Sequence, residues 1–459
     1  MGSKTPSEKQ RQMLEAPEGK LLIALAAPAV YSQLISIIYN IVDTYLVSHI
    51  GTEATAAVGI VYSLSLVIYA ISYGPAMGSN SLVSRCIGAG RVDQANQYTI
   101  SALVLSIVMG LLVTLVVLPA RYPLMRFLGA TDELIEYSVA YGVWLAVAAP
   151  VICGEIVLSM SLRAEGTSLP TTIALCIGGV CKIALEPILI TKCGLGVAGA
   201  SISTLIGEGI SFSLLLTVYL SGKSVVKLQL KNVSRNIRDY VLLLRTGVPS
   251  VARQFAGVIA SVFMNRGAAP YGAALIAAIS IHNKIYQFCR AVVVGIGHGY
   301  QAIAGYNFGA GKIKRVRRTF KLACAFGTVL CSCFMLIIFT QAPALVNWFR
   351  DDPDVVTSGT VMLRAMALAL PMLSYSTFVN QLYQCLGFSG TASFLASCRQ
   401  AIFFVPVILV LSRCFGMFGI QIAQPVSDTL TFLISIPFQI AFYKRHLQLS
   451  HDLPKSNSV

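Results

Sequence analysis

Apolar residues form long segments along the chain, and short polar loops separate them. A helix needs about 20 predominantly apolar residues to cross a bilayer. The pattern therefore predicts an all-α integral membrane protein with twelve transmembrane helices. The predicted helices lie near residues 20–48, 55–84, 95–120, 134–162, 168–192, 196–221, 240–266, 272–305, 315–341, 357–386, 391–415 and 418–443.

The second half of the chain repeats the first half at an offset of 221 residues. One fixed spacing over this length indicates a duplicated unit. Each copy holds six predicted helices, so both copies enter the membrane from the same side, and a pseudo-two-fold axis along the membrane normal should relate them. Such parallel repeats are typical of secondary transporters. Matching pairs are Pro28 and Pro249, Gln33 and Gln254, Gly78 and Gly299, Pro150 and Pro371, Gly166 and Gly387, and Cys193 and Cys414.

The repeat divides the chain into two lobes with short flanking segments. We expect an N-terminal segment over residues 1–19, an N-lobe over 20–221, a basic linker over 222–239, a C-lobe over 240–443 and a tail over 444–459. The N-terminal segment is polar and lacks the apolar core of a signal peptide, so we expect the first helix to be retained.

Composition and charge support a membrane location. Hydrophobic residues make up 56% of the chain and charged residues 12%, against about 25% charged residues in a soluble domain. The net charge is +15, and the basic residues gather in loops on the side of the N-terminus. This asymmetry predicts cytoplasmic termini in the cell (plasma) membrane. The basic runs then act as topology signals, and we expect no nucleic-acid partner. We expect a monomer.

The cysteines do not indicate a metal site or a disulfide framework. Twelve cysteines occur, and none forms a CxxC pair. Free, packed thiols are the expected state. We expect no cofactor and no bound metal, and we see no nucleophile, base or metal cluster that would indicate an enzyme.

Charged residues inside the predicted helices indicate where the mechanism lies. Each is costly in lipid, so most of them should pair or face a wet cavity. Four of the five acids lie in the first half of the chain, and five of the six bases lie in the second. The acids are Asp43, Glu155, Glu186, Glu208 and Asp428, and the bases are Lys182, Arg253, Lys284, Arg290, Arg364 and Arg399.

The first predicted helix carries a polar stripe that ends at Asp43. Helical spacing places Ser32, Gln33, Ser36, Tyr39 and Asn40 on or near one face with it. Such a stripe lines water or protein.

Two further carboxylates share helix faces with polar neighbours. Lys182 and Glu186 are four residues apart, as are Thr204 and Glu208. An intramembrane carboxylate in a partly dry site can take up protons in the physiological range. The alternative is a structural ion pair between Lys182 and Glu186.

Several segments resemble the multidrug and toxic compound extrusion (MATE) exporters. They are Pro28 and Asp43 on the first helix, residues 185–190 (LEPILI), residues 88–91 and 309–312 (GAGR and GAGK), and residues 305–310 (GYNFGA). The resemblance covers residues 20–443 and implies a twelve-helix antiporter that exchanges organic compounds for protons or sodium by alternating access. The DinF-like and MepA-like branches imply a coupling site at Asp43, Lys182, Glu186 and Thr204, a bending proline at Pro28, and cavity positions at Tyr39 and Tyr141.

The chain departs from the family pattern at the coupling site. Where the family commonly has Asn-x-x-x-Asp-Pro, this chain has Lys182 and Glu186 before Pro187. A lysine ammonium there would occupy the place of a sodium ion. The sodium-linked NorM branch also needs acids on the seventh and tenth helices, and residues 240–266 and 357–386 contain none. Both departures favour proton coupling.

Polar and basic residues of the predicted C-lobe indicate the other half of a substrate cavity. Arg253 and Gln254 correspond to Ser32 and Gln33 of the polar stripe, and Lys284 and Arg290 lie at similar depth on the next helix. These bases favour an organic anion as substrate, whereas the family usually carries cationic drugs. The alternative is that Glu155, Glu208 or Asp428 neutralises them, or that they bond backbone carbonyls.

Three motifs are better interpreted as structural features. Residues 295–299 (GIGHG) predict close helix packing rather than nucleotide binding. Residues 351–354 (DDPD) predict a helix N-cap. His282 and His298 lack a second metal ligand at suitable spacing and are expected to pack between helices.

Two other functions are compatible with parts of this pattern. A flippase for lipid-linked precursors would also need a cationic cavity and twelve or more helices. A membrane-embedded lipid-modifying enzyme would need a catalytic cluster at a membrane face, and the sequence contains none that we recognise.

Overall fold

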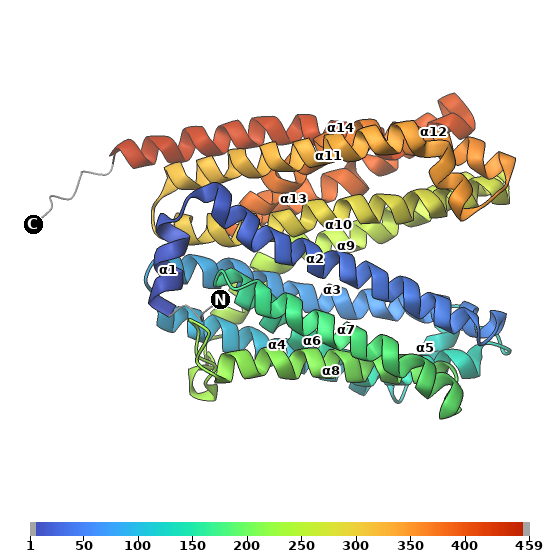
Figure 1. Cartoon of the computed structure of the whole chain (residues 1–459), viewed down its shortest axis with the longest axis horizontal. Helices are drawn as coiled ribbons and strands as arrows, with labels where there is room; N and C mark the ends of the chain where they lie inside the picture. The colour runs from blue at the N-terminus through green and yellow to red at the C-terminus, as the bar shows by residue number, and fades with distance from the viewer. Residues whose placement is uncertain (1–5, 453–459) are drawn as a thin grey trace, which may run out of the picture.

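The computed structural model describes residues 6–452, which fold into helices joined by short loops (Figure 1). The N-terminal half begins with a short helix, α1 (Pro6–Glu15). The membrane helices of this half are α2 (Glu18–Ser48), α3 (Thr52–Gly88), α4 (Val92–Val117), α6 (Ile135–Ala164), α7 (Leu169–Pro187) and α8 (Val197–Leu220), and α5 (Arg121–Phe127) lies in a loop. A π-helical turn over Ile188–Lys192 extends α7.

The second half repeats this series. Its helices are α9 (Ile237–Ala268), α10 (Ala273–Gly309), α11 (Ile313–Phe349), α12 (Pro353–Cys385), α13 (Ser389–Ser397) and α14 (Phe404–Asp452). A π-helical turn over Cys398–Ile402 joins α13 to α14. Single turns over Leu230–Asn232 and Ala269–Tyr271 complete the helical structure.

The predicted transmembrane segments are all helical. Ten helical segments of the described chain are long and apolar enough to cross a membrane, and the last of them covers 56 residues. A straight helix of that length would measure about 84 Å, far more than the hydrocarbon thickness of about 30 Å. Gly416, with φ 55° and ψ −130°, breaks this segment into two helices. The polar helix α10 supplies the remaining predicted span.

The kink at Gly416 has a counterpart in the first half. Gly196, before α8, has φ 53° and ψ −132°. Both are left-handed conformations that favour glycine. The offset here is 220 rather than 221, because the second copy has one residue fewer after Cys414 than the first has after Cys193. The repeat therefore preserves the backbone turn across this deletion.

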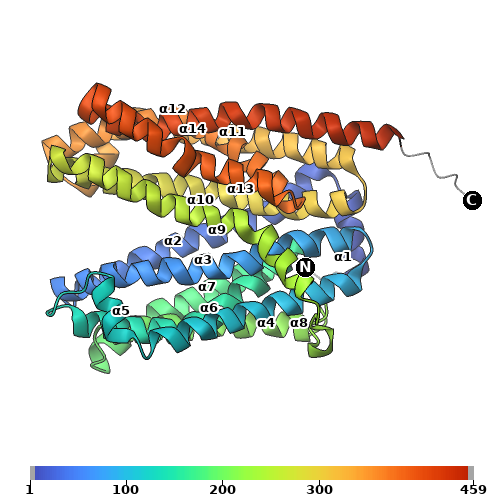
Figure 2. The same cartoon turned by 180° about the vertical axis from the view of Figure 1, so that it is seen from behind.

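Each half forms its own helical lobe. Within the N-lobe α6 packs on α3, α4 and α8, and within the C-lobe α12 packs on α10, α11 and α14. These two central helices correspond in the repeat, and more than half of the residues of each are buried. Figure 2 shows the lobes from behind as two layers, with α2 and α3 facing α9 and α10.

The lobes meet through close helix crossings. The most extensive contacts between the halves are α2 with α10, α3 with α9, and α3 with α10. The crossing of α3 and α10 is reciprocal: a Cβ atom at Gly88 would overlap the carbonyl of Tyr306, and a Cβ atom at Gly309 would overlap the carbonyl of Arg85. Since 306 and 309 are the repeat counterparts of 85 and 88, this contact follows the pseudo-two-fold axis.

Glycines allow an equally close approach of helices at other contacts. A Cβ atom at Gly295 or Gly299 would meet the backbone of α2, and one at Gly297 would meet the side chain of Gln381. The packing role predicted for residues 295–299 is thus confirmed. The N-cap prediction is also confirmed, because the Asp352 carboxylate accepts a hydrogen bond from the backbone N–H of Asp354 at 3.0 Å.

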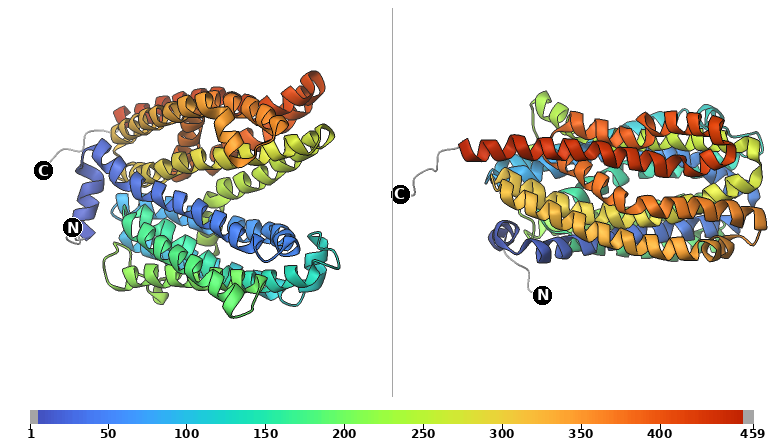
Figure 3. Two further views of the ribbon diagram at one scale, coloured as in Figure 1. Left: turned by 45° about the vertical axis from the view of Figure 1, so that its right-hand side comes forward. Right: turned by 90° about the horizontal axis from the view of Figure 1, so that it is seen from above.

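The crossings lie toward the end of the molecule that carries α1. From this end the two lobes diverge (Figure 3, left). The segment around α1 adds contacts here, because Asn307 donates to the carbonyl of Met13 at 3.2 Å and Arg315 lies 3.5 Å from Glu18. The lobes are therefore held together at this end.

The linker between the lobes is fixed to the N-lobe by Glu165, just beyond the end of α6. Its carboxylate accepts hydrogen bonds from the Ser224 hydroxyl at 2.7 Å and from the Val225 N–H at 2.8 Å. Burial raises the pKa of Glu165 to about 7, while these hydrogen bonds act in the opposite direction. The start of the linker is consequently part of the folded N-lobe.

The reciprocal glycine contact makes a testable prediction. Gly88→Ala and Gly309→Ala should each destabilise the protein by about 1–3 kcal/mol, because the added methyl group must push a backbone carbonyl away. The measurement is the melting temperature of the detergent-solubilised protein.

Gly209→Ala is the matched control, because a Cβ atom at this helical glycine meets nothing within 4 Å. It should be neutral or stabilising by up to about 1 kcal/mol. Equal stability of all three variants would contradict the proposed contact.

Candidate functional site

An ion pair inside the N-lobe joins two helices that lie far apart in the sequence. The ammonium of Lys182 on α7 is 2.8 Å from Asp43 Oδ1 on α2. Both residues are largely buried, with exposed fractions of 8% and 7%. A buried pair of this kind ties its two helices together only while both groups keep their charges.

Glu186 lies beside this pair without a donor of its own. It is fully buried, and neither carboxylate oxygen has a hydrogen-bond partner among residues 6–452. Its charged neighbours are Asp43 and Lys182. The ion pair between Lys182 and Glu186, which the sequence offered as an alternative, is not formed within 4 Å. The lysine reaches across to α2 instead of along its own helix.

A small cavity continues this site toward α8. It measures about 10 Å³ and is lined by Tyr39, Lys182, Thr204 and Glu208 among others. This is roughly the space for one water molecule. The Tyr39 ring lies 5.5 Å from the Lys182 ammonium. The Thr204 hydroxyl donates to the carbonyl of Ala200 on its own helix at 3.0 Å, so its hydrogen is not directed at the ion pair.

Pro28 on α2 is surrounded by hydroxyl groups. A proline inside a helix lacks the N–H that would bond the preceding turn. Ser32 and Thr172 both donate to the Pro28 carbonyl, at 3.0 and 2.7 Å, and their hydroxyl oxygens lie 2.8 Å apart. Pro28 of α2 is thereby linked to α7, the helix that carries Lys182. Thr172 was not predicted; its position in the first turn of α7 gave no signal in the sequence.

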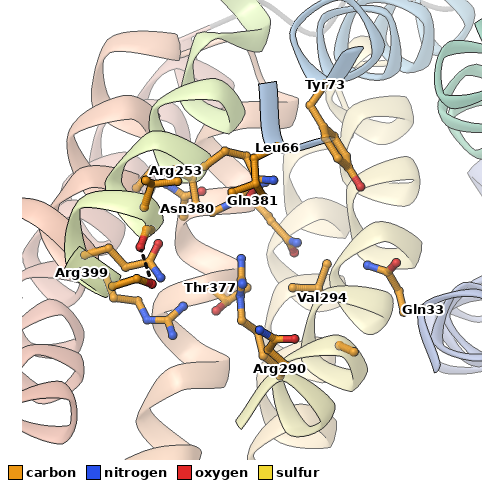
Figure 4. Close-up of a pocket in the computed structure, with 18 of the residues that line it drawn as sticks. Gln33, Leu66, Tyr73, Arg253, Arg290, Val294, Thr377, Asn380, Gln381 and Arg399 are labelled. Carbon is orange, nitrogen blue, oxygen red and sulfur yellow. Dashed lines mark hydrogen bonds between the residues drawn. The ribbon is translucent and has the colours of Figure 1, made fainter. Parts of the chain in front are cut away.

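A larger cavity of about 630 Å³ lies between the two lobes (Figure 4). Its volume falls in the usual range for small-molecule sites. The lining positions on α2 and α9 come from the middle of each helix and from the half that lies away from α1. The cavity is therefore on the far side of the glycine crossings. Residues predicted for it that do line it are Gln33, Ser36, Asn40, Arg253, Gln254 and Arg290.

Arginines supply the charge of this cavity. The lining includes Arg253, Arg290 and Arg399 and no Asp, Glu or Lys. Arg399 is neutralised, because its Nε lies 2.8 Å from Asp428 Oδ1. Arg253 donates a long hydrogen bond of 3.3 Å to Ser250. In the described part of the chain neither Arg253 nor Arg290 has a carboxylate within 4 Å.

Three predicted cavity residues lie elsewhere. Tyr39 lines the small cavity of the N-lobe and not the large one. Lys284 is exposed, with its ammonium 6.0 Å from the Phe349 ring, and it does not line the cavity. It lies six residues, nearly two helical turns, from Arg290, which turns it to another face of α10. Tyr141 is buried in the N-lobe, where Asp43 and Glu186 are its charged neighbours. It belongs with the ion pair and not with the large cavity.

The cavity also contains residues that the sequence did not single out. Amide side chains come from Asn380 and Gln381 on α12 and from Gln400 next to Arg399, and Tyr73 also lines the cavity. His298, which the sequence assigned to helix packing, is part of the lining as well. Asn380 and Gln381 lie nine and ten residues after Pro371. Two adjacent amide side chains within a transmembrane helix are the signal that could have found them.

Comparison with known proteins identifies relatives over almost the whole chain. The family described as MatE matches residues 28–188 and 249–410, one match for each repeat. The multidrug export protein MepA of Staphylococcus aureus strain MSSA476 is 25% identical over 433 residues, covering 92% of this chain and 93% of MepA. MepA of Staphylococcus saprophyticus is 23% identical over 421 residues, covering 91% and 92%.

Solved structures show the same fold. An outward-facing multidrug resistance MATE family transporter of the MOP superfamily matches with a TM-score of 0.91 at 22% identity, over 98% of this chain and 100% of that one. A MOP superfamily transporter from Pyrococcus furiosus, described as having a binding pocket of reverse polarity that suggests a different function, matches with a TM-score of 0.90 at 22% identity over 96% and 99%.

The ion pair yields a prediction about coupling energies. Lys182→Met or Asp43→Asn alone should destabilise the protein by about 3–5 kcal/mol, and the double variant by much less than the sum, because neither member of the pair is then left without its partner. Unfolding free energies in mixed micelles provide the measurement.

A second double-mutant cycle serves as the matched control. It combines Lys182→Met with Glu186→Gln instead of Asp43→Asn. Because Lys182 contacts Asp43 and not Glu186, this second cycle should give the smaller coupling energy. A larger coupling energy with Glu186 than with Asp43 would rule out the observed pairing.

Proposed function

The chain belongs to the MatE family of transporters, and from this premise we propose that it is a secondary active exporter of organic compounds driven by a proton gradient. The observation that carries the proposal is the group formed by Asp43, Lys182 and Glu186. It supports a site that binds protons in the N-lobe, beside a cavity for substrate between the lobes.

Charge balance explains why this group would bind a proton. With both carboxylates ionised and the lysine charged, the group carries one net negative charge in a region with little water. Two neighbouring carboxylates resist simultaneous ionisation, and burial opposes the charged form of each. One bound proton makes the group neutral. Protons entering from the more acidic side can therefore drive a change at this site.

The position of that proton would decide which helices are tied together. A proton on Glu186 leaves Asp43 ionised and keeps its bond to Lys182. A proton on Asp43 leaves Glu186 ionised, and Lys182 can turn to it, because the two are four residues apart on one helix face. The second arrangement breaks the ionic link between α2 and α7.

A movement of α2 would be transmitted directly to the C-lobe. α2 contains Pro28, where a helix bends most readily, and it packs against α10 of the C-lobe. We therefore propose that protonation lets α2 bend and shifts its crossing with α10. The cavity would then open alternately to the two sides of the membrane, as expected for two repeats that rock about a central site.

Sodium is disfavoured as the coupling ion on chemical grounds. Its usual ligands are carboxylate, carbonyl and hydroxyl oxygens. At this site an ammonium already neutralises Asp43 at 2.8 Å. A sodium ion would have to displace the lysine charge at considerable electrostatic cost.

We further propose that the protein works as a monomer in the cell membrane with both termini in the cytoplasm. The distribution of Lys and Arg supports this orientation. The closed end of the molecule, where α1 lies, would then face the cytoplasm, and the cavity would face outward. The relatives named MepA, which are multidrug export proteins, support an exporter of small organic compounds.

Transport in proteoliposomes tests the driving ion. Two permanently charged probes, pyrenebutyltrimethylammonium and pyrenebutylsulfonate, cover both signs of substrate charge. At least one should accumulate on the acidic side of a membrane with a pH gradient, since each pH unit supplies about 1.4 kcal/mol per proton. A sodium gradient at uniform pH should have no effect. Accumulation driven by sodium alone would contradict proton coupling.

Substitution at the proposed proton site gives the second test. Asp43→Asn should abolish accumulation driven by the pH gradient while the protein still folds, because the side chain keeps its shape and cannot ionise. Asp132→Asn is the matched control: it removes a carboxylate that is paired with Arg126 at the surface and should transport normally. Normal coupled transport by the Asp43 variant would place the proton site elsewhere.

A further inference from the structure

The charge of the large cavity is not balanced by the protein itself. Three guanidinium groups contribute to its lining, and the one carboxylate in contact with them, Asp428, is bound to Arg399. Asp428 is further occupied by Gln424, which donates to it at 2.9 Å. Among residues 6–452, Arg253 and Arg290 thus keep their positive charges without a carboxylate partner.

The acids of the N-lobe do not neutralise these arginines. Asp43 is bound to Lys182, and neither Glu155 nor Glu208 lines the cavity. The lining on the N-lobe side is polar but uncharged, with Gln33, Ser36 and Asn40 from α2. A ligand between the lobes therefore meets positive charge on one wall and neutral hydrogen-bonding groups on the other.

The two free arginines face the same space. Arg253 on α9 and Arg290 on α10 both extend into the cavity in Figure 4. Both guanidinium groups belong to the lining of this one cavity. Two like charges in a partly dry cavity repel each other, and a ligand anion between them would relieve that repulsion. Guanidinium groups also present paired N–H donors that suit carboxylate, sulfonate and phosphate oxygens.

The surroundings fit the rest of an organic anion. Thr377 and Gln381 on α12 lie close to the arginines and offer hydrogen-bond donors (Figure 4). Apolar side chains, including Leu66, Val258 and Val294, line the remaining wall. This combination suits an amphiphile that has one anionic group and an apolar body.

We propose, on the premise that the chain is an exporter, that its substrates are organic anions whose charged group binds between Arg253 and Arg290. Arg399 and its partner Asp428 form the neutral edge of this site. The anionic group is a carboxylate, sulfonate or phosphate on an apolar body, and a cationic compound of the same shape binds more weakly.

Equilibrium binding to the purified full-length protein tests this proposal without any ion gradient. The two probes pyrenebutylsulfonate and pyrenebutyltrimethylammonium differ only in the charged group. We expect the sulfonate to bind at least about 10-fold more tightly, the scale of one hydrogen bond to a charged group. Equal or tighter binding of the ammonium probe would overturn the proposal.

Variants assign the binding to the two arginines. Arg253→Gln and Arg290→Gln should each weaken sulfonate binding by about 10-fold or more, with little effect on the ammonium probe. Arg253→Lys keeps the charge but loses the paired donors, and an intermediate loss is expected. It also provides a folded variant if the glutamine substitutions prevent folding. Unchanged sulfonate binding in all three variants would refute the site.

Arg364→Gln is the matched control, because Arg364 lies outside the cavity, exposed and 5.6 Å from the Phe339 ring. It should bind the sulfonate as the wild type does. Binding in nanodiscs with and without phosphatidylglycerol separates two sources of the anion: competition by this lipid assigns the site to a lipid headgroup, and lack of competition assigns it to a soluble amphiphile. Either result supports the binding of an anionic group between Arg253 and Arg290.

The binding and transport experiments fail independently. If the ammonium probe is exported on a pH gradient and the sulfonate does not bind, the anion proposal is wrong and the exporter proposal stands. If the sulfonate binds through Arg253 and Arg290 but neither probe moves on a pH gradient, proton-driven export is wrong and the anion site stands.

Discussion

The cost of placing ionised side chains in a membrane constrains both halves of this structure. Each lobe meets the cost with one close ion pair, Asp43 with Lys182 and Arg399 with Asp428, both at 2.8 Å. Each lobe also keeps charge of one sign beyond its pair. In the N-lobe this charge includes the carboxylates of Glu186, Glu155 and Glu208, and in the C-lobe it includes Arg253 and Arg290. An unpaired charge inside a membrane favours the reversible binding of an opposite charge. Our account assigns the proton to the N-lobe and the organic anion to the C-lobe.

The helical frame makes this division of roles possible. The lobes are copies of one unit, and they touch through glycine crossings such as the reciprocal contact of Gly88 with Tyr306 and of Gly309 with Arg85. These contacts gather at one end, so the opposite end is left for the cavity. Because α2 carries Asp43 and Pro28 and also packs on α10, one helix connects the charged site of the N-lobe with the surface of the C-lobe.

The sequence predicted the architecture well, because hydrophobic length and a fixed repeat are strong signals. It also singled out Asp43, Lys182 and Glu186, which the structure brings together. Partners were harder to predict: Lys182 shares a helix face with Glu186, yet it bonds Asp43, and only the packing of α2 on α7 decides this. The misplacement of Lys284 has a similar cause, since depth in the membrane does not fix which face of α10 a residue occupies. The role of Thr172 became visible only when α7 and α2 met.

Infrared spectroscopy of the reconstituted protein tests the central claim most directly, because protonated and ionised carboxyl groups absorb at different frequencies. Spectra recorded between about pH 5 and pH 8 should contain the signal of a buried protonated carboxyl group. Our account predicts that Glu186→Gln or Asp43→Asn removes or shifts this signal and that sodium leaves it unchanged. A signal that is identical in the wild type and both variants, or that disappears when sodium is added, would contradict a proton site at Asp43, Lys182 and Glu186.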